Sequence, residues 1–98
     1  MDNEDLVDTS PNLSLDQSSL PPLSIRLWEA NGRQCGLCGK YLEIQHLTLD
    51  HVVPKVHGGK REGNLLPAHS WCNNQKGDRL PTEIELRRLI DNNARILY

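Results

Sequence analysis

The sequence of 98 residues contains no phenylalanine, and its other large aromatic residues are only two Trp and two Tyr. A core must therefore be built from Leu, Ile, Val and the tryptophans. No apolar run approaches the roughly 20 residues of a membrane-spanning helix, and the N-terminus has no apolar segment typical of a secretory signal. These absences predict an intracellular protein with a modest core, in the cytoplasm (of the host cell, if a phage encodes it).

Basic residues are missing from the first 23 positions, which hold five of the 13 acidic residues and many Ser, Asn and Pro. Such a segment buries too little apolar surface to offset its ordering entropy. We predict a disordered acidic arm at residues 1–23 and one folded domain at residues 24–98. The arm is either an inert leader or a segment that pairs with the basic body or with a partner protein. The body has eight acidic against 11 basic residues, a formal charge of +3 that is compatible with a phosphate-bearing partner.

Cysteine is scarce, and the three cysteines cannot all be paired in disulfides within one chain. Two of them form the close-set pair Cys35-x2-Cys38, with glycines that let the backbone curl. In a reduced compartment such a pair favours a metal over a disulfide. A redox role is the alternative, but it requires a strand–helix–strand context that the sequence does not predict. A body of roughly 75 residues also commonly needs a staple such as a metal.

A second pair, His69-x2-Cys72, follows downstream. Zinc prefers four sulfur and nitrogen ligands supplied in two close pairs. The sequence therefore predicts a structural zinc site, although a buried His beside a free Cys is the alternative. On a helix, His69 would lie about 60° from Cys72 and about 40° from Asn73, so it can reach toward either of two metal sites. The predicted zinc ligands are Cys35, Cys38, His69 and Cys72.

Between and beside these pairs lie Asp50-His51, Asn64 and Asn73. A divalent ion such as Mg²⁺ prefers oxygen ligands, which Asp50 and the Asn73 amide can supply. A histidine side chain ordinarily titrates near neutrality, which suits His51 to accept a proton from water. Each of these residues has a structural explanation by itself. Their combination with the zinc pairs favours a second, hydrolytic metal site.

Residues 41–53 are rich in strand formers with alternating polarity. They predict two antiparallel strands, at roughly 40–44 and 47–53. In a regular strand Asp50 and His51 point to opposite faces. A shared site therefore requires a bend or a bulge near these two residues.

A loop is predicted at residues 55–63, followed by a helix over residues 64–76. Asn64 would occupy the N-cap of this helix. Pro67 would lie in its first turn, where a missing N–H does no harm. A zinc ion held by both pairs would then tie the turn of the first pair to this helix and close a loop across the strands.

Two further helices flank this unit. Ser24 is expected to cap a short helix over residues 25–31, whose Ile25 and Trp28 pack on the body; Trp28 stacking on a base is the alternative. A capping box, Thr82-x-x-Glu85, starts the last helix. The apolar residues expected to cover the core are Leu86, Leu89, Ile90 and Leu97, and those expected to face outward, solvated or on phosphate, are Arg87, Arg88 and Arg95.

The motifs together resemble those of the HNH endonuclease family, whose ββα-metal core is two strands followed by a helix. The match covers about 43 of the 98 residues. It departs from the usual family pattern at His69, where a cysteine is more common. The resemblance implies an α+β fold: a zinc-stapled ββα-metal core between a short N-terminal and a C-terminal helix. The matching positions are Cys35-x2-Cys38, Asp50-His51, Pro54, Gly58-Gly59, Asn64-Leu65 and Cys72-Asn73-x2-Lys76-Gly77.

The resemblance also implies an activity. The protein would be a metal-dependent DNA endonuclease that hydrolyses phosphodiester bonds with a single divalent ion (Mg²⁺, Mn²⁺ or similar), with low sequence specificity by itself. His51 would be the general base, Asp50 and Asn73 would hold the ion, and Asn64 would brace the loop that orients His51. The expected phosphate contacts are Lys55, Lys60, Arg61 and Lys76.

Two other functions remain open from the sequence. One is a zinc-held module that binds nucleic acid or protein without cutting. The other is an auxiliary subunit whose activity requires a larger partner in a DNA-processing complex. His57, which precedes the two glycines, has no clear role in the family, and contact with phosphate and contact with nothing are both open.

Overall fold

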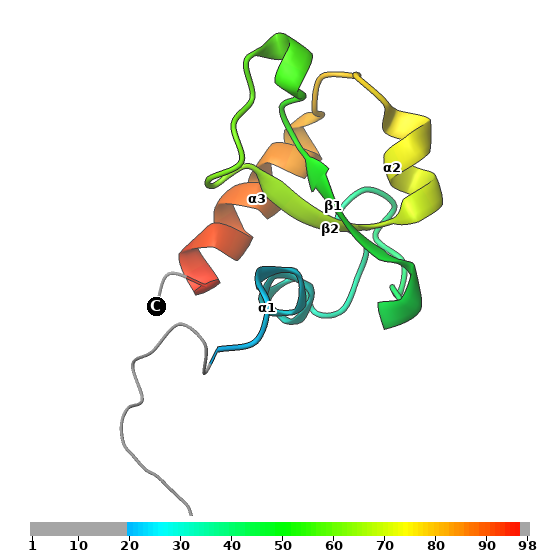
Figure 1. Cartoon of the computed structure of the whole chain (residues 1–98), viewed down its shortest axis with the longest axis vertical. Coiled ribbons are helices and arrows are strands. Elements are labelled where there is room, and N and C mark those ends of the chain that lie inside the picture. The colour runs from blue at the N-terminus through cyan, green and yellow to red at the C-terminus, as the bar shows by residue number, and fades with distance from the viewer. Residues whose placement is uncertain (1–19, 97–98) are drawn as a thin grey trace, which may run out of the picture.

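The computed structural model describes residues 20–96 (Figure 1). It confirms the predicted α+β class, with a strand–strand–helix unit between a first and a last helix. Within the described range, no helix is both long and apolar enough to cross a membrane. The prediction of an acidic arm falls mostly on residues 1–19, which lie outside this range. The elements are α1 (Leu23–Ala30), η2 (Ile44–His46), β1 (Leu47–His51), η3 (Lys55–His57), β2 (Leu65–His69), α2 (Ser70–Lys76) and α3 (Glu83–Ile96).

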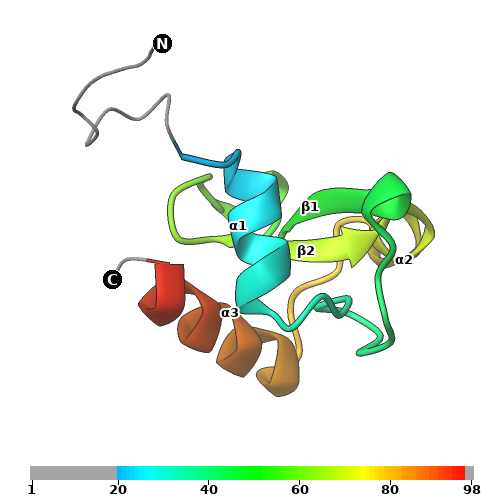
Figure 2. The ribbon, with the colours of Figure 1, turned by 90° about the horizontal axis from the view of Figure 1, so that it is seen from below.

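The two strands pair with each other in antiparallel register, from Leu47↔His69 to His51↔Leu65. Helices α1 and α3 lie side by side, and α2 lies toward the opposite end of the sheet, as Figure 2 shows. Because α2 follows β2 without a loop, the last residue of β2 and the first turn of α2 occupy the same region. This continuity brings His69 close to Cys72.

The predicted strand partners were wrong. Residues 40–44 form no strand and contribute only an isolated bridge, Gln34↔Tyr41, so β1 pairs with β2 instead. The helix predicted from Asn64 was also wrong over 65–69, which is extended and fully buried. A short apolar run reads alike as a buried strand or a helix segment. Pro67 fits because a two-stranded sheet has only edge strands, where a missing N–H is tolerated.

The core joins α1 to the sheet and to the cysteine turn. Trp28 packs with Cys35, Leu42 and Ala68, and its Nε1–H donates to the carbonyl of Leu42 at 2.7 Å. The predicted packing of α1 on the body is thus confirmed. The predicted Ser24 cap is wrong: α1 begins two residues earlier than expected, with Pro22 at the N-cap position and no side-chain cap bond.

Helix α3 begins with the predicted capping box, since Glu85 N–H donates to Thr82 Oγ1 at 3.2 Å and Thr82 N–H to Glu85 Oε1 at 2.9 Å. Its buried face differs from the prediction. Leu89 is buried, but Leu86 and Ile90 are 39% and 68% exposed. Polar Glu85 and Asn92 are buried in their place because each has a hydrogen-bond partner. Leu97 lies outside the described residues.

The arginines of α3 do not all face outward. Arg88 is half-buried and donates to the carbonyl of Gly36 at 2.7 Å, and Arg95 donates to Ala30 at the C-terminus of α1 at 2.6 Å. A cation is favourable at the C-terminal end of a helix. Arg87 and Arg95 are exposed, as predicted, whereas Arg88 is not. α3 therefore ties both α1 and the cysteine turn to the body.

Candidate metal and catalytic sites

The four predicted zinc ligands lie together. The sulfur atoms of Cys35, Cys38 and Cys72 and a ring nitrogen of His69 are all within 4.8 Å of one another. The turn that carries the first pair packs directly on β2, because Gly36 N–H donates to the carbonyl of Pro67 at 2.7 Å. A Cβ at Gly36 would lie 2.9 Å from Leu66 Cδ1 and 3.1 Å from that oxygen, so any larger residue here would force its neighbours to shift.

His69 is oriented by backbone rather than by another side chain. Its Nε2 lies 3.0 Å from the carbonyl oxygen of Tyr41. Because a carbonyl only accepts, Nε2 carries the proton, and Nδ1 is left to face Cys38 and Cys72 at 3.5 and 3.8 Å. The ring of Trp71 stacks on His69 with centroids 4.4 Å apart. The histidine thus presents one nitrogen to the sulfur atoms in a fixed orientation.

The electrostatics of the cluster also fit a cation. Burial disfavours the Cys35 thiolate, but the N–H groups of Cys38, His69 and Leu37 outweigh this and lower its pKa to about 7. Burial and the neighbouring Cys35 raise the pKa of Cys72 to about 12. Sulfur atoms this close repel one another when ionised unless a cation lies between them. Three sulfurs and one nitrogen match the ligands that zinc prefers.

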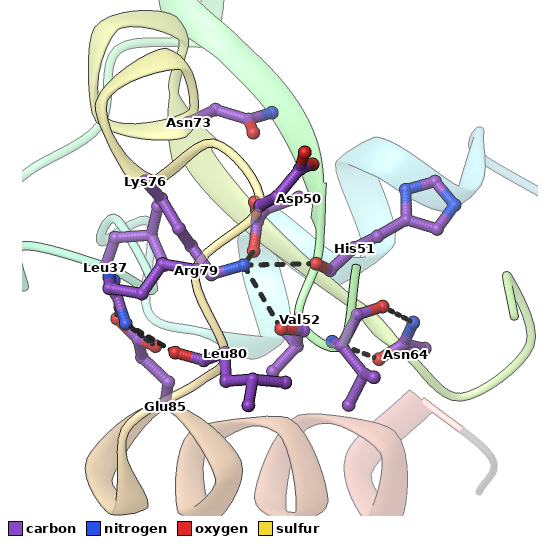
Figure 3. A network of polar contacts seen from close by, with 12 residues as sticks. Leu37, Asp50, His51, Val52, Asn64, Asn73, Lys76, Arg79, Leu80 and Glu85 are labelled. Carbon is purple, nitrogen blue, oxygen red and sulfur yellow. Dashed lines mark hydrogen bonds and ion pairs between the residues drawn. The ribbon is translucent and has the colours of Figure 1, made fainter. Parts of the chain in front are cut away.

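Three of the four residues of the second predicted site, Asp50, His51 and Asn73, line one cavity of about 240 Å³ at the end of β1. Asp50 and His51 come from the strand, Asn73 from α2, and Lys55 from η3. Of the predicted bend or bulge, the bulge is absent, because the register runs unbroken through Asp50↔Leu66 and His51↔Leu65, but the backbone bends directly after His51, at residues 52–53. In Figure 3 the imidazole of His51 points away from the ammonium of Lys76. Asp50 and His51 both line the cavity because β1 ends at His51 and the chain then turns into η3.

Asp50 is 2% exposed, and its Oδ2 lies 3.2 Å from the ammonium of Lys76. The angles of this ion pair do not make a hydrogen bond, so buried Oδ2 has none among the described residues. Burial raises the pKa of Asp50, and Lys76 opposes that shift. The Asn73 amide nitrogen donates to Thr48 Oγ1 and to the Leu49 carbonyl, both at 3.3 Å, which leaves the amide oxygen as the ligand atom. Carboxylate and amide oxygens fit a divalent ion such as Mg²⁺ or Mn²⁺.

Asn64 lies outside this cavity and does not cap α2. Its Oδ1 accepts from the N–H of Val53 at 2.9 Å, and its Nδ2 donates to the carbonyls of Val53 and Lys60 at 2.9 and 2.6 Å. The side chain therefore joins the two ends of the loop that follows β1. His57, which had no role from the sequence, contacts the Asp78 carbonyl through Nε2 at 3.1 Å and links η3 to the end of α2.

Three of the four predicted phosphate contacts are exposed and the fourth is buried. Lys55 is exposed at the cavity, and Lys60 and Arg61 are exposed on the same loop. Lys76 is not at the surface: its side chain is 1% exposed. The sequence does not reveal which residues surround Lys76. Its position three residues after Asn73 indicates only that the two side chains lie about 60° apart on one face of a helix.

The fold is a small unit of the ββα type with a four-residue Cys/His cluster suited to a metal ion. Residues 35–79 match the family model described as HNH endonuclease. The match covers both ligand pairs, β1, β2 and α2, and ends before α3. No curated protein matched the chain.

Proposed function

We propose that the protein is a metal-dependent DNA endonuclease. The observation that carries this proposal is the convergence of Asp50, His51 and Asn73 on one cavity within the part of the chain that matches the HNH endonuclease model. A module that only binds nucleic acid needs a zinc frame but not a carboxylate, an imidazole and an amide around the same space. The cavity is open to solvent, as an extended polymer substrate requires.

His51 is the proposed general base. It is half-buried at the cavity, and its ring is not engaged in the Lys76 contacts, so it is free to accept a proton from water. Asp50 and Asn73 would hold the divalent ion, which when bound supplies charge stabilisation to the phosphate and the leaving 3′ oxygen. The expected products carry 5′-phosphates. Asn64 supports this role by fixing the backbone that follows His51.

The proposed substrate is DNA bound mainly through its phosphates. Lys55, Lys60 and Arg61 lie on the loop that borders the cavity, and such contacts give affinity without sequence information. Specific protein–DNA interfaces bury on the order of 1,000–2,500 Å² of protein surface. A body of roughly 75 residues offers little room for that. We therefore infer weak sequence preference for the chain acting alone.

The test is cleavage of plasmid DNA by the zinc-loaded protein with Mg²⁺ or Mn²⁺. His51→Ala should lower the rate about 100-fold or more, because general-base catalysis is typically worth that much. His46→Ala is a matched control, since His46 is a half-buried histidine that does not line the cavity. Unchanged cutting by folded His51→Ala protein would remove His51 from this role. Binding of DNA with no cutting at all would favour the binding module or the auxiliary subunit.

A further inference from the structure

Lys76 places a buried positive charge beside the carboxylate proposed to hold the catalytic ion. Its Nζ lies 3.2 Å from Asp50 Oδ2, and it donates to the carbonyls of His51 at 3.2 Å and Val52 at 3.1 Å (Figure 3). All three partners belong to the end of β1 or the residue after it. The ammonium is enclosed, so water screens its charge little.

The charges around this position cancel in the protein alone. Asp50 is paired with Lys76, and next to them Glu85 is paired with Arg79 at 2.9 Å. Asn73, the other proposed ligand, is neutral. At the rim of the cavity, the acid Asp78 is offset by Lys55. A divalent cation entering the cavity would therefore meet almost no net negative charge from the protein.

We propose that Lys76 makes binding of the divalent ion depend on DNA. Lys76 neutralises Asp50, so the protein alone holds the ion weakly, and a DNA phosphate supplies the missing negative charge. The inference rests on the proposed function, because it takes the Asp50 and Asn73 cavity as the ion site. A unit charge a few ångströms from an ion changes its affinity by roughly tenfold or more at the effective dielectric constant of protein sites. By linkage, the ion tightens DNA binding by the same factor.

The charge of Lys76 can be separated from its hydrogen bonds. Lys76→Arg keeps the charge and the donors to the two carbonyls. Lys76→Met removes both with nearly the same shape, and Lys76→Gln removes the charge but keeps one donor. A purely structural role predicts that loss of the donors weakens the site. The proposed role predicts that loss of the charge strengthens ion binding.

The experiment measures the affinity of the zinc-loaded full chain for Mn²⁺ from the paramagnetic resonance signal of the free ion. It uses the His51→Ala background, so that a short DNA duplex stays intact, and compares samples with and without that duplex. In this background DNA should tighten Mn²⁺ binding about tenfold or more. Lys76→Met should tighten DNA-free binding by a similar factor and reduce the effect of DNA, whereas Lys76→Arg should not. Asp50→Asn is the control that removes the site.

The proposal fails if folded Lys76→Met protein binds Mn²⁺ no more tightly than its parent without DNA. If Lys76→Met does not fold, Lys76→Gln decides by the same comparison. Tight Mn²⁺ binding by the parent that DNA does not change would also overturn it. No cutting is measured, so a chain that binds Mn²⁺ in this way but cuts nothing would contradict the proposed function and leave this inference standing.

Discussion

Glu85 illustrates how a single buried acid contributes to the fold. Its carboxylate accepts two hydrogen bonds from Arg79, at 3.2 and 2.9 Å, and one from the Thr82 N–H. Burial alone would raise the pKa of Glu85, but these contacts outweigh it and lower the pKa below the ordinary value of 4.5. The acid is therefore more readily ionised in the folded chain than in the unfolded one.

Glu85→Gln should lower the free energy of unfolding at pH 7 by about 1 kcal/mol. This value is smaller than is usual for a hydrogen bond to a charged group, because Arg79 is half-exposed and water screens its charge. A lowered pKa stabilises the fold above the unfolded pKa, and this contribution is lost as the pH falls through the folded pKa. The difference between the two proteins should thus persist from pH 7 to about 4.5 and shrink below it. Urea unfolding at several pH values measures it. Glu83→Gln, which removes an exposed pair with Arg87, should have almost no effect.

Sequence reasoning succeeds at the residue scale where spacing carries the information. The pairs Cys35-x2-Cys38 and His69-x2-Cys72 predict a four-ligand cluster, and the structure brings the four together. Sequence reasoning fails where the group that orients a ligand belongs to the backbone. The Tyr41 carbonyl that orients His69 leaves no trace in residue identity, since any amino acid there supplies the same oxygen. The burial of Lys76 is similarly hidden, because lysine is ordinarily a surface residue.

At the scale of elements, the loop between β1 and β2 is held by packing as well as by Asn64. A Cβ added at Gly59 would lie 1.7 Å from the carbonyl oxygen of Val53 and 2.9 Å from Asn64 Nδ2. At neighbouring Gly58 a Cβ would meet nothing within 4 Å, although its φ of +89° disfavours other residues. The two adjacent glycines are therefore needed for different reasons.

Gly59→Ala should destabilise the fold by roughly 3 kcal/mol or more, because a backbone carbonyl has to move. Gly58→Ala should cost about 1–2 kcal/mol, the conformational penalty alone. Chemical denaturation of the two variants provides the comparison. An equal decrease in the free energy of unfolding of the two variants would show that the close approach of Gly59 to Val53 does not constrain the loop.

The elements that sequence reasoning placed wrongly have physical explanations. Residues 65–68 are apolar throughout, which erases the periodicity that separates a strand from a helix. On α3, Glu85 and Asn92 occupy the buried face because Arg79 and Asn31 are positioned to satisfy them. Arg79 lies outside the helix, six residues before Glu85, and Asn31 lies 61 residues before Asn92, so the apolar pattern of the helix does not reveal either partner. The capping box, whose partners are local, was predicted correctly.

At the scale of the whole molecule, the Cys/His cluster joins segments far apart in sequence. Its first pair lies in the turn after α1, and its second pair lies at the end of β2 and on α2. Two small core clusters, one around Trp28 and one around Leu66, are the apolar support around this junction. Metal at the cluster would therefore contribute directly to the stability of the fold.

We expect about one zinc ion per chain by elemental analysis and loss of cooperative unfolding in Cys35→Ser protein. Removal of zinc by a strong chelator should have the same effect, measured by circular dichroism. Tyr41→Phe is a matched control, since Tyr41 supplies only its backbone carbonyl to the cluster and its side chain is exposed. Full structure in a metal-free sample would contradict the assignment of a structural metal.

The stacking of Trp71 on His69 gives the molecule an optical property. Trp28 is sealed in the core, whereas Trp71 is 51% exposed with one ring face against a proposed zinc ligand. The two indoles thus report on separate events: one on collapse of the interior, the other on the electronic state of the neighbouring imidazole. Intrinsic fluorescence can therefore show, without any added dye, whether loss of the metal and loss of the packed interior occur together.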